Sequence, residues 1–249
     1  MYKKIKNILI KLFNKDFIIK NELILRHLYG FFYSGRNFQC TICNKKLRKF
    51  IDIFEDDLMC PNCGSLARTR RLQSILLQDF LVNQSVKILD FSPPRCRYRK
   101  LKKNTQIDYV STDYAGEFMS DKQLNIVNID EPDNRYDLIV CYHILEHIKE
   151  DKKAISELFR IMKPGGRGII QTPFKDGDIY EDDSIKTEAE RRIHFGQEDH
   201  VRVYSVSGLC ERLEKAGFVT KSIKYHDKHP NFYGFRHETV IFIEKVITP

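Results

Sequence analysis

From residue 86 onward, short apolar runs alternate with helical patterns, and this alternation is the strongest constraint on the fold. The runs are rich in β-branched and aromatic residues, and we expect strands at 86–91, 107–112, 124–129, 136–142, 166–172, 218–226 and 239–246. A helix is expected at Glu150–Met162, ended by the run Lys163–Gly166, and another at 205–216. Such alternation predicts an α/β fold with a doubly wound, mostly parallel, seven-stranded sheet.

A strand joins directly to three ionisable side chains in the run Arg135–Lys149. Its apolar part, 138–140, is typical of a strand buried on both faces. His143, Glu146 and His147 follow at offsets of three and four, so a helical turn would place them on one face. Because open α/β sheets bind ligands beyond the carboxyl ends of their strands, we expect the chemistry here.

Four of the seven cysteines form two matched C-x2-C pairs, separated by sixteen residues. They are Cys40, Cys43, Cys60 and Cys63. Two such turns can close a tetrahedron of thiolates around one ion, which is the pattern of structural zinc. The short strand expected at 50–54 is too small to fold alone, and Gly64 supplies a permissive backbone after the second pair. With four protein ligands no coordination position stays open, so we expect a structural rather than a catalytic Zn²⁺.

The segment after the second cysteine pair predicts a helix that completes a zinc-ribbon module at 37–82. Ser65 can cap this helix, and an apolar stripe is expected to be buried. The stripe consists of Leu72, Ile75, Leu76 and Phe80. Three arginines, at 68, 70 and 71, leave two interpretations open: a solvated face, or a site for an anion such as phosphate or RNA.

The positive charge is concentrated in an N-terminal arm, residues 1–36. This arm has a net charge of +6 out of +8 for the whole chain, so the remainder is near neutral. Apolar residues at helical spacing over 5–13 predict a basic amphipathic helix, and 22–33 a second helical piece. Three roles stay open for the arm: packing on the body or on a second subunit, lying on an anionic membrane surface, or contacting nucleic acid.

Composition and patterning favour a cytoplasmic protein. No apolar run approaches the roughly 20 residues of a membrane span, and no signal peptide with a small-residue cleavage site is visible. Because the N-terminal arm is basic, a peripheral location at the inner face of the membrane stays open as an alternative.

Seven short runs of the body follow one another in a fixed order. They are Val86–Asp90, Tyr109–Asp113, Asn128–Asp130, Tyr136–Ile139, His143–His147, Lys163–Gly166 and Gly217–Phe218. Together they resemble the class I S-adenosylmethionine-dependent methyltransferases, with the Leu-Glu-His and Lys-Pro-Gly-Gly segments as the most specific parts. The resemblance implies a Rossmann-like methyltransferase domain at 83–249 that uses S-adenosylmethionine as its cofactor.

The resemblance also implies cofactor contacts for six residues. They are Asp90, Ser92, Asp113, Tyr114, Asp130 and His143. The turn after the first strand would hold the methionine part, and the acid that ends the second strand would hold the ribose hydroxyls. The acid after the third strand would face the adenine, and the histidine would line the pocket from the fourth.

The turn after the first strand departs from the family pattern. The family has a glycine-rich turn there, whereas this chain has the run Asp90–Arg95 with two consecutive prolines. Proline fixes φ and has no N–H, so the turn must be rigid and cannot donate as the usual loop does. We expect the cofactor to be held by a different turn, with weak or lost binding as the alternative.

Methyl transfer is an in-line displacement that needs an aligned acceptor and, for a hydroxyl, a general base. We expect His147 to be that base, with His143 and then His194 and His200 as further candidates. The last two lie in the irregular stretch 174–204, which we interpret as a lid or substrate loop because long connections are usually functional.

A second, catalytic metal is a further hypothesis. Some methyltransferases of RNA ends and of quinones carry a Glu-x2-Glu-His metal site at this place, one adding a distant histidine. The group here would be His143, Glu146, His147 and His200. Because a histidine stands at the first position, the resemblance of this motif is incomplete.

Three functions follow, in order of preference. The leading one is methyl transfer to a hydroxyl or amine of a small molecule, a sugar or glycan intermediate, because the cysteine module resembles a subgroup often met beside polysaccharide genes. The second is an RNA methyltransferase whose zinc module holds the nucleic acid, against which the near-neutral body counts. The third is a zinc-ribbon scaffold with an inactive body, which the two prolines keep open.

Overall fold

The computed structural model describes residues 17, 20–54, 57–80, 86–226 and 231–247. The chain forms two compact units, the first made of 1–82 with 226–237 and the second of 83–225 with 238–249. The segment 226–237, which the sequence placed with the body, is thus part of the first unit. The amphipathic helix predicted at 5–13 lies outside the described residues. No helix in the described part of the chain is both long and apolar enough to cross a membrane.

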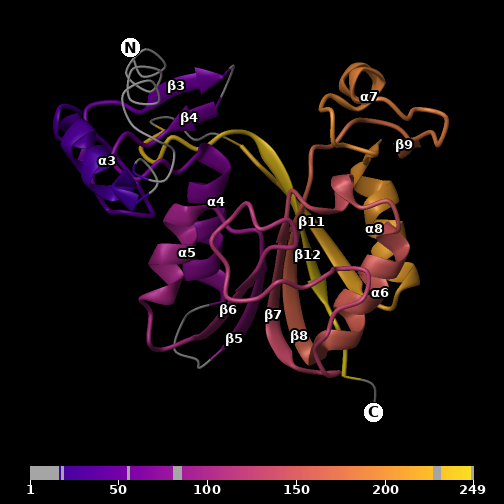
Figure 1. The fold of residues 1–249 in the computed structure, drawn as a ribbon. Coiled ribbons are helices and arrows are strands. Elements are labelled where there is room, and N and C mark those ends of the chain that lie inside the picture. Colours follow the sequence, from indigo (N-terminus) through magenta and orange to yellow (C-terminus); the bar gives the residue numbers. More distant parts are fainter. Residues whose placement is uncertain (1–16, 18–19, 55–56, 81–85, 227–230, 248–249) are drawn as a thin grey trace. The chain divides into compact units, whose positions relative to one another are not determined.

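The first unit contains short strands and helices around the cysteines. Its elements are α3 (Glu22–Phe31), β1 (Ser34–Gln39), β2 (Lys46–Leu47), β3 (Ile51–Phe54), β4 (Asp57–Met59), α4 (Ala67–Ile75) and the π-helix η1 (Leu76–Phe80). Strands β1 and β2 pair antiparallel. So do β3 and β4, which are labelled in Figure 1. The helical piece expected at 22–33 is confirmed, and the predicted apolar stripe of the linking helix is buried.

Arg70 and Arg71 are buried inside the first unit. Neither interpretation of the three arginines, a solvated face or an anion site, therefore applies to these two. Arg70 is fully buried and donates to four backbone carbonyls, among them those of Tyr233 (2.7 Å) and Gly234 (2.5 Å). Its guanidinium stacks 3.9 Å from the ring centre of Phe50. These contacts fasten the segment 231–237 to the cysteine module, and Arg71 adds a hydrogen bond to the carbonyl of residue 236.

The second unit is built on a six-stranded sheet in the order β11-β12-β8-β7-β5-β6. The strands are β5 (Lys87–Phe91), β6 (Asp108–Thr112), β7 (Tyr136–Tyr142), β8 (Met162–Gln171), β11 (Val219–Tyr225) and β12 (Glu238–Glu244). Strands β6, β5, β7 and β8 are parallel neighbours, and β12 is antiparallel to β8 and β11. The mostly parallel Rossmann-like sheet is confirmed, but it has six strands and not seven.

The strand predicted at 124–129 is the one that does not form. The Asn125 side chain accepts a hydrogen bond from the Val127 N–H (3.2 Å), and the Asn125 carbonyl accepts one from the Asn128 N–H (3.0 Å). An asparagine that bonds its own neighbouring backbone in this way favours a turn over a strand. The apolar side chains of the segment still reach the core: Leu124, Ile126 and Ile129.

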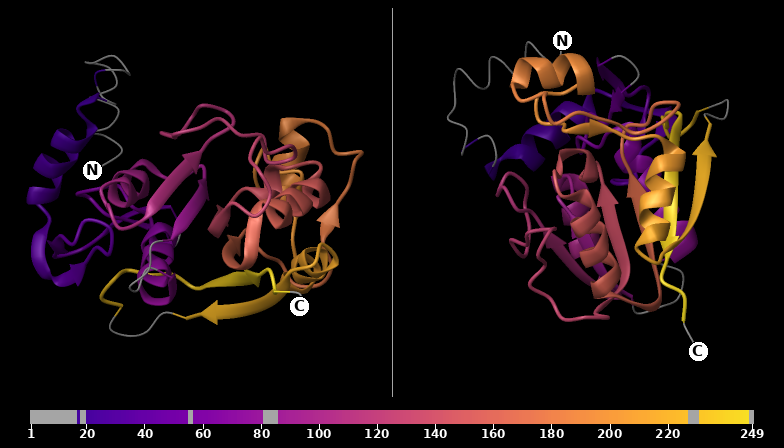
Figure 2. Two further views of the ribbon diagram at one scale, coloured as in Figure 1. Left: turned by 90° about the horizontal axis from the view of Figure 1, so that it is seen from below. Right: turned by 90° about the vertical axis from the view of Figure 1, so that its right-hand side faces the viewer.

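Helices cover both faces of this sheet. Helix α5 (Arg95–Lys102) lies on one face, and α6 (Asp151–Ile161) and α8 (Val206–Lys215) lie side by side on the other (Figures 1 and 2). The path β5–α5–β6 and the path β7–α6–β8 run in opposite directions across the sheet, so right-handed crossovers place their helices on opposite faces. The strand order therefore reverses between β5 and β7, and open α/β sheets bind ligands at such a switch point.

The stretch 174–204 is ordered and contains elements of its own. These are β9 (Tyr180–Glu181), α7 (Glu188–Phe195) and β10 (Arg202–Val203), with β9 and β10 paired antiparallel. Thr187 and Glu190 form a capping box at the start of α7, and Gly196 ends the helix at φ +87°. Figure 1 shows α7 and β9 beyond the end of the sheet toward which the parallel strands point.

Candidate functional site

Two non-glycine residues with a left-handed backbone mark the switch point. Ser92 (φ +45°) directly follows β5, and His143 (φ +59°) directly follows β7. Such a conformation costs about 1–3 kcal/mol and clusters at functional sites. The Ser92 N–H donates to the Thr112 carbonyl (2.7 Å), and the His143 N–H donates to the Gln171 carbonyl (2.8 Å). These bonds hold both turns in place across neighbouring strands.

The turn with two prolines is built around Ser92, which adopts the positive φ that a glycine usually provides. Pro94, at φ −56°, leads into α5. The Ser92 hydroxyl donates to the Asp113 carboxylate over 2.6 Å, which joins the end of β5 to the end of β6. The chain thus has a tight turn at the expected place without the glycine.

Asp113 organises the loop after β6. It is 4% exposed, and its second carboxylate oxygen accepts from the backbone N–H groups of Glu117 (2.7 Å) and Phe118 (3.2 Å). Because an ionised carboxylate offers about four lone-pair positions, a ribose hydroxyl can add to these partners or replace Ser92. Tyr114, directly beside it, is 63% exposed. The pair fits the ribose contact that the resemblance implies.

The other predicted cofactor residues differ in burial. The Asp90 carboxylate is completely buried and accepts hydrogen bonds from Arg97 and from the Tyr109 hydroxyl (2.8 Å). Burial raises the pKa of Asp90 to about 6, although the Arg97 charge and these hydrogen bonds act to lower it. Asp130 is exposed at the end of its turn. Their contacts with methionine and adenine stay predictions. The Asp90 carboxylate joins the end of β5 to α5 through Arg97 and to β6 through Tyr109.

Glu146, His147 and His200 come together from segments far apart in the sequence. One ligand atom of each lies within 4.8 Å of the others. The rings of His147 and His200 meet edge to face, with 4.7 Å between their centres. His143 instead directs Nδ1 to the Glu146 carboxylate (3.1 Å). The predicted group of four is thus assembled, with His143 as a hydrogen-bond partner of the carboxylate.

Two opposing influences act on the Glu146 carboxyl group, which is 1% exposed. Burial alone would raise its pKa, but the hydrogen bond and charge of His143, helped by the charge of His147, lower the pKa below its ordinary value. A buried carboxylate that stays ionised attracts cations or protonated groups. His194, the fourth histidine candidate, lies apart from this group: it is exposed on α7 and bonds the Tyr180 hydroxyl (2.9 Å).

Arg202 ties the histidine-bearing stretch to the loop after β7. It is 5% exposed and donates to the carbonyls of Leu145 (3.3 Å), Ile148 and Lys149 (2.9 Å) and to the Glu181 carboxylate (2.8 Å). The Val201 N–H also donates to the Glu146 carbonyl (2.9 Å). The two segments that carry the cluster are therefore fixed against each other by buried hydrogen bonds.

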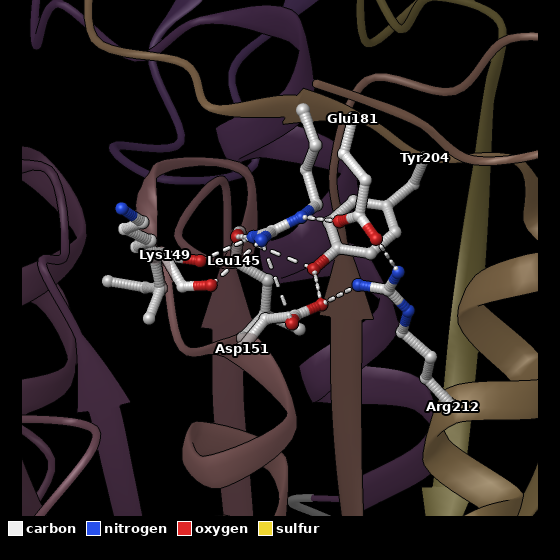
Figure 3. Close-up of polar contacts among 8 residues, drawn as sticks. Leu145, Lys149, Asp151, Glu181, Tyr204 and Arg212 are labelled. Atoms are coloured by element: carbon white, nitrogen blue, oxygen red, sulfur yellow. Dashed lines mark hydrogen bonds and ion pairs between the residues drawn. The ribbon is translucent and has the colours of Figure 1, made fainter. Parts of the chain in front are cut away.

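A second arginine completes this network. Arg212 of α8 pairs with Asp151 and Glu181, and the Tyr204 hydroxyl donates to Asp151 (Figure 3). The sequence alone predicts Arg202 only as part of a lid. Its position between Val201 and Val203 could have indicated this network, because an arginine inside an apolar run is usually buried with partners.

A cavity of about 620 Å³, lined mostly by charged residues, lies beside this network. Arg202 and Val201 line it together with basic and acidic side chains of three segments. The charged groups around it include Lys149, Lys152, Lys186, Arg191, Asp182 and Asp183. Such a lining suits a polar molecule with several hydrogen-bonding groups.

The four predicted cysteine ligands gather in the first unit, within 4.8 Å of one another. The sulfurs of Cys40 and Cys63 are 3.6 Å apart, and those of Cys43 and Cys60 are 3.8 Å apart. Zn–S bonds of about 2.3 Å in a tetrahedron place the sulfurs about 3.8 Å apart, so the set fits zinc. Hydrogen bonds from the other three thiols lower the pKa of the Cys40 thiol well below its ordinary value.

Both cysteine turns use the same backbone device. Asn44 (φ +58°) and Gly64 (φ +78°) follow the second cysteine of each pair, and their N–H groups donate to the carbonyls of Cys40 (2.8 Å) and Cys60 (2.9 Å). The permissive backbone expected at Gly64 is confirmed.

The prediction that Ser65 caps the following helix is wrong. Its hydroxyl lies 3.2 Å from the Cys40 sulfur and 3.3 Å from the Cys63 sulfur. Asp57 accepts from the Ala67 N–H (3.2 Å) at the start of α4 instead. The thiols therefore compete successfully with the helix end for the serine hydroxyl.

Comparisons with known proteins agree with this geometry. A family model described as a methyltransferase domain matches residues 72–223. A "Probable S-adenosylmethionine-dependent methyltransferase" of Mycolicibacterium smegmatis is 29% identical over 101 residues, which are 38% of this chain and 33% of that protein. A ubiquinone biosynthesis O-methyltransferase of Aeromonas salmonicida is 27% identical over 91 residues, 36% of this chain and 38% of that protein. The chain thus spans little more than a third of the length of these relatives.

The fold comparison points the same way. The structure of Haemonchus contortus phosphoethanolamine N-methyltransferase 2 in complex with S-adenosyl-L-methionine has a TM-score of 0.53 and 13% identity, covering 72% of this chain and 52% of that one. At this identity the likeness concerns the fold alone. The fold, the reversal of strand order between β5 and β7 and the family match over most of the second unit agree, and the chain belongs to the class I methyltransferase family.

Proposed function

We propose that this protein transfers the methyl group of S-adenosylmethionine to a hydroxyl or amine of a small polar molecule. The observation that carries the proposal is the switch point itself, where Ser92, Asp113 and His143 end three neighbouring parallel strands inside the family match. Asp113, with Tyr114 beside it, would hold the ribose. Asp130 would reach the adenine, and the Ser92 turn, supported by Asp90, would face the methionine part.

S-adenosylmethionine supplies an electrophilic methyl carbon on a positively charged sulfur. A lone pair of the acceptor oxygen or nitrogen forms the new bond to that carbon, while the electrons of the broken carbon–sulfur bond stay on sulfur. The acceptor proton needs a base, and His147 is suited to take it at Nε2. Its Nδ1 lies 3.1 Å from an Asp199 carboxylate oxygen, which would keep the proton on Nδ1 and orient the ring.

A polar acceptor is favoured by the cavity beside the Arg202 network. Its lining of lysines, arginine and aspartates offers hydrogen bonds to several hydroxyl groups at once. One curated relative is named an O-methyltransferase, which is consistent with a hydroxyl acceptor. Within polar small molecules we place sugars and glycan intermediates first.

RNA is less favoured as the acceptor. The arginines of the linking helix were the proposed contact, but the donors of Arg70 are spent on backbone carbonyls, and Arg71 is 8% exposed with its guanidinium over Phe235. Of that group, only Arg68 has an accessible guanidinium, and it pairs with Asp57 (3.5 Å).

We further propose that the four cysteines hold a structural Zn²⁺. The support is the tetrahedral spacing of the sulfurs and the burial of Cys40 and Cys60. Four thiolates leave no open coordination position, so this ion would stabilise the first unit and take no part in methyl transfer.

Calorimetric titration with S-adenosylmethionine and with S-adenosylhomocysteine tests the proposed function. We expect binding of both ligands, loss of binding in Asp113→Ala, and retention in Glu117→Ala, which changes an exposed acid of the same loop. Absence of binding by the folded wild type would overturn the proposal and favour the scaffold interpretation.

The acceptor class is then tested by release of S-adenosylhomocysteine from mixtures of sugars, sugar nucleotides or RNA. Turnover with sugars that changes little with salt supports the small-molecule acceptor. Turnover with RNA alone, falling steeply as salt rises, would contradict it, because binding to phosphates releases counterions.

A further inference from the structure

We propose that Glu146, His147 and His200 bind one divalent transition-metal ion, in addition to the ion of the cysteine module. The three side chains offer one carboxylate and two imidazoles within 4.8 Å of one another. His143, which the sequence motif placed among the ligands, is not a ligand in this arrangement. The argument uses the hydrogen bonds around the cluster and does not depend on methyl transfer.

The hydrogen bonds of both histidines leave the same ring nitrogen available. Nδ1 of His200 lies 3.1 Å from the Phe195 carbonyl, and Nδ1 of His147 lies 3.1 Å from the Asp199 carboxylate. A carbonyl or carboxylate oxygen accepts a proton from Nδ1 and so makes Nε2 the nitrogen with a lone pair. Metal-binding histidines are oriented by this kind of partner on their other nitrogen. Since the two rings are in contact, the Nε2 atoms of both histidines can bind the same ion.

Glu146 supplies the negative charge. One of its oxygens bonds His143, while Oε2 is buried and makes no hydrogen bond to any residue that the structure describes. A buried carboxylate oxygen without a partner is unfavourable, and more so when it is charged. A bound cation would offset this cost. His143 would then fix the orientation of the carboxylate from its other side.

Hydrogen bonds made by neighbouring residues hold the three ligands in place. The Val201 N–H bonds the Glu146 carbonyl, and Arg202 spans the carbonyls of Leu145 and Lys149 (Figure 3). These bonds connect the backbone on both sides of the ligand pair to the backbone next to His200. A site that stays assembled through buried bonds of its supporting residues is preorganised for an ion.

The donor set selects the class of ion. Two imidazoles and one carboxylate suit Zn²⁺, Mn²⁺, Fe²⁺ or Co²⁺, whereas Mg²⁺ and Ca²⁺ prefer oxygen ligands. Three protein ligands leave positions open, as in catalytic sites and unlike the closed thiolate cluster. If the proposed function holds, an acceptor oxygen at an open position would lose its proton more readily. With His147 bound to the ion, the acceptor proton would pass to solvent water, and the ion would take over the activation that we assign to His147 in the absence of metal.

The test uses the full chain with its cysteine module loaded with zinc, titrated with Mn²⁺ by calorimetry and by Mn²⁺ electron paramagnetic resonance. Mn²⁺ is chosen because it favours oxygen and nitrogen ligands over thiolates. We expect one bound Mn²⁺ per chain. Asp199→Asn, which leaves all three ligands, should weaken binding about 10–100-fold. Glu146→Gln and His200→Gln should weaken it by more than that.

The control is His27→Gln, an exposed histidine on α3, which should bind Mn²⁺ as the wild type does. Circular dichroism checks that each variant is folded, and Asp199→Asn changes a side chain that is 61% exposed, so its effect on folding should be small. Failure of Mn²⁺, Co²⁺ and additional Zn²⁺ to bind the wild type would overturn the proposal. So would Mn²⁺ affinity that is unchanged in folded Glu146→Gln. Neither outcome depends on S-adenosylmethionine binding or turnover.

Discussion

The cysteine module and the switch point of the sheet are stabilised in different ways. In the module, four thiols from two short turns meet within 4.8 Å, and each turn brings two of them close through local backbone bonds. At the switch point, the ionisable side chains come from strands and loops far apart in the sequence. They are positioned by buried guanidinium groups, Arg97 under the first turn and Arg202 behind the histidines.

This difference determines what each region tolerates. If the four cysteines hold one zinc ion as proposed, the module depends on a single centre, and loss of one ligand should affect the whole unit. The switch point depends on several separate hydrogen-bond networks, so loss of one should weaken part of it. Substitutions in the two regions should therefore differ in size and in their response to metal and pH.

The largest effect is expected from Cys60→Ser. Structural zinc sites in small domains contribute about 10–16 kcal/mol of binding free energy, so losing a thiolate should unfold much of the first unit. Zinc content by mass spectrometry should fall by one equivalent, and protease should cleave within residues 37–80. Cys96→Ser, a partly buried cysteine outside the cluster, is the control and should keep its zinc. An unchanged zinc content in Cys60→Ser would show that the thiols do not form the site.

Arg202→Met should have the next largest effect and should act on the second unit. It leaves three carbonyls and two carboxylates without their shared donor, a loss of about 3–5 kcal/mol by comparison with other broken buried pairs. Arg202→Lys should recover little of it, because an ammonium cannot span the same fork of acceptors. Denaturant unfolding of both variants measures the loss, and a loss below about 1 kcal/mol would contradict a bracing role.

The same contrast explains which features could be predicted from the sequence. The cysteine site was predictable because only two residues separate the ligands in each pair and the turn itself brings them together. The parallel sheet was predictable because short apolar runs alternate with helical patterns. The strand at 124–129 was wrong because Asn125 bonds its own neighbours, a local competition that hydrophobic pattern does not report.

The residues at the switch point could be predicted only in part. The position of His143, Glu146 and His147 after a strand followed from the alternation, and Asp113 from the family resemblance. The joining of His200 to that group depends on Arg202 and on the ordered stretch between β8 and α8, and no spacing in the sequence encodes these contacts. Likewise, no pattern marked Arg97 as the partner of Asp90.

Arg97→Met should show a smaller loss that depends on pH. Burial raises the pKa of Asp90 above its ordinary value, to about 6. The charge of Arg97 acts in the opposite direction and keeps this pKa from rising further. Without Arg97 the pKa should rise further. The folded variant then binds a proton that the unfolded chain does not, so its stability falls as pH rises through neutrality. Its deficit relative to wild type should be larger at pH 8 than at pH 5, by about 1.4 kcal/mol per unit of further rise.

Denaturant unfolding at pH 5 and pH 8 checks this prediction. The stability deficit of Cys60→Ser should not change with pH in this way, because the Asp90 carboxyl lies in the other unit. A deficit for Arg97→Met that is equal at both values of pH would mean that Asp90 is not the group that responds.

The smallest effect is expected at Ser92, where a matched pair of substitutions separates backbone strain from the hydroxyl contact. Ser92→Ala and Ser92→Gly both remove the hydrogen bond to Asp113, but only glycine adopts φ +45° without steric cost. Glycine also gains entropy in the unfolded chain, which offsets part of that advantage. We expect Ser92→Gly to be more stable than Ser92→Ala by about 0.5–1 kcal/mol in denaturant unfolding. Equal stability would show that the turn relaxes in the variants, and that the left-handed backbone depends on the serine hydroxyl rather than on the surrounding strands.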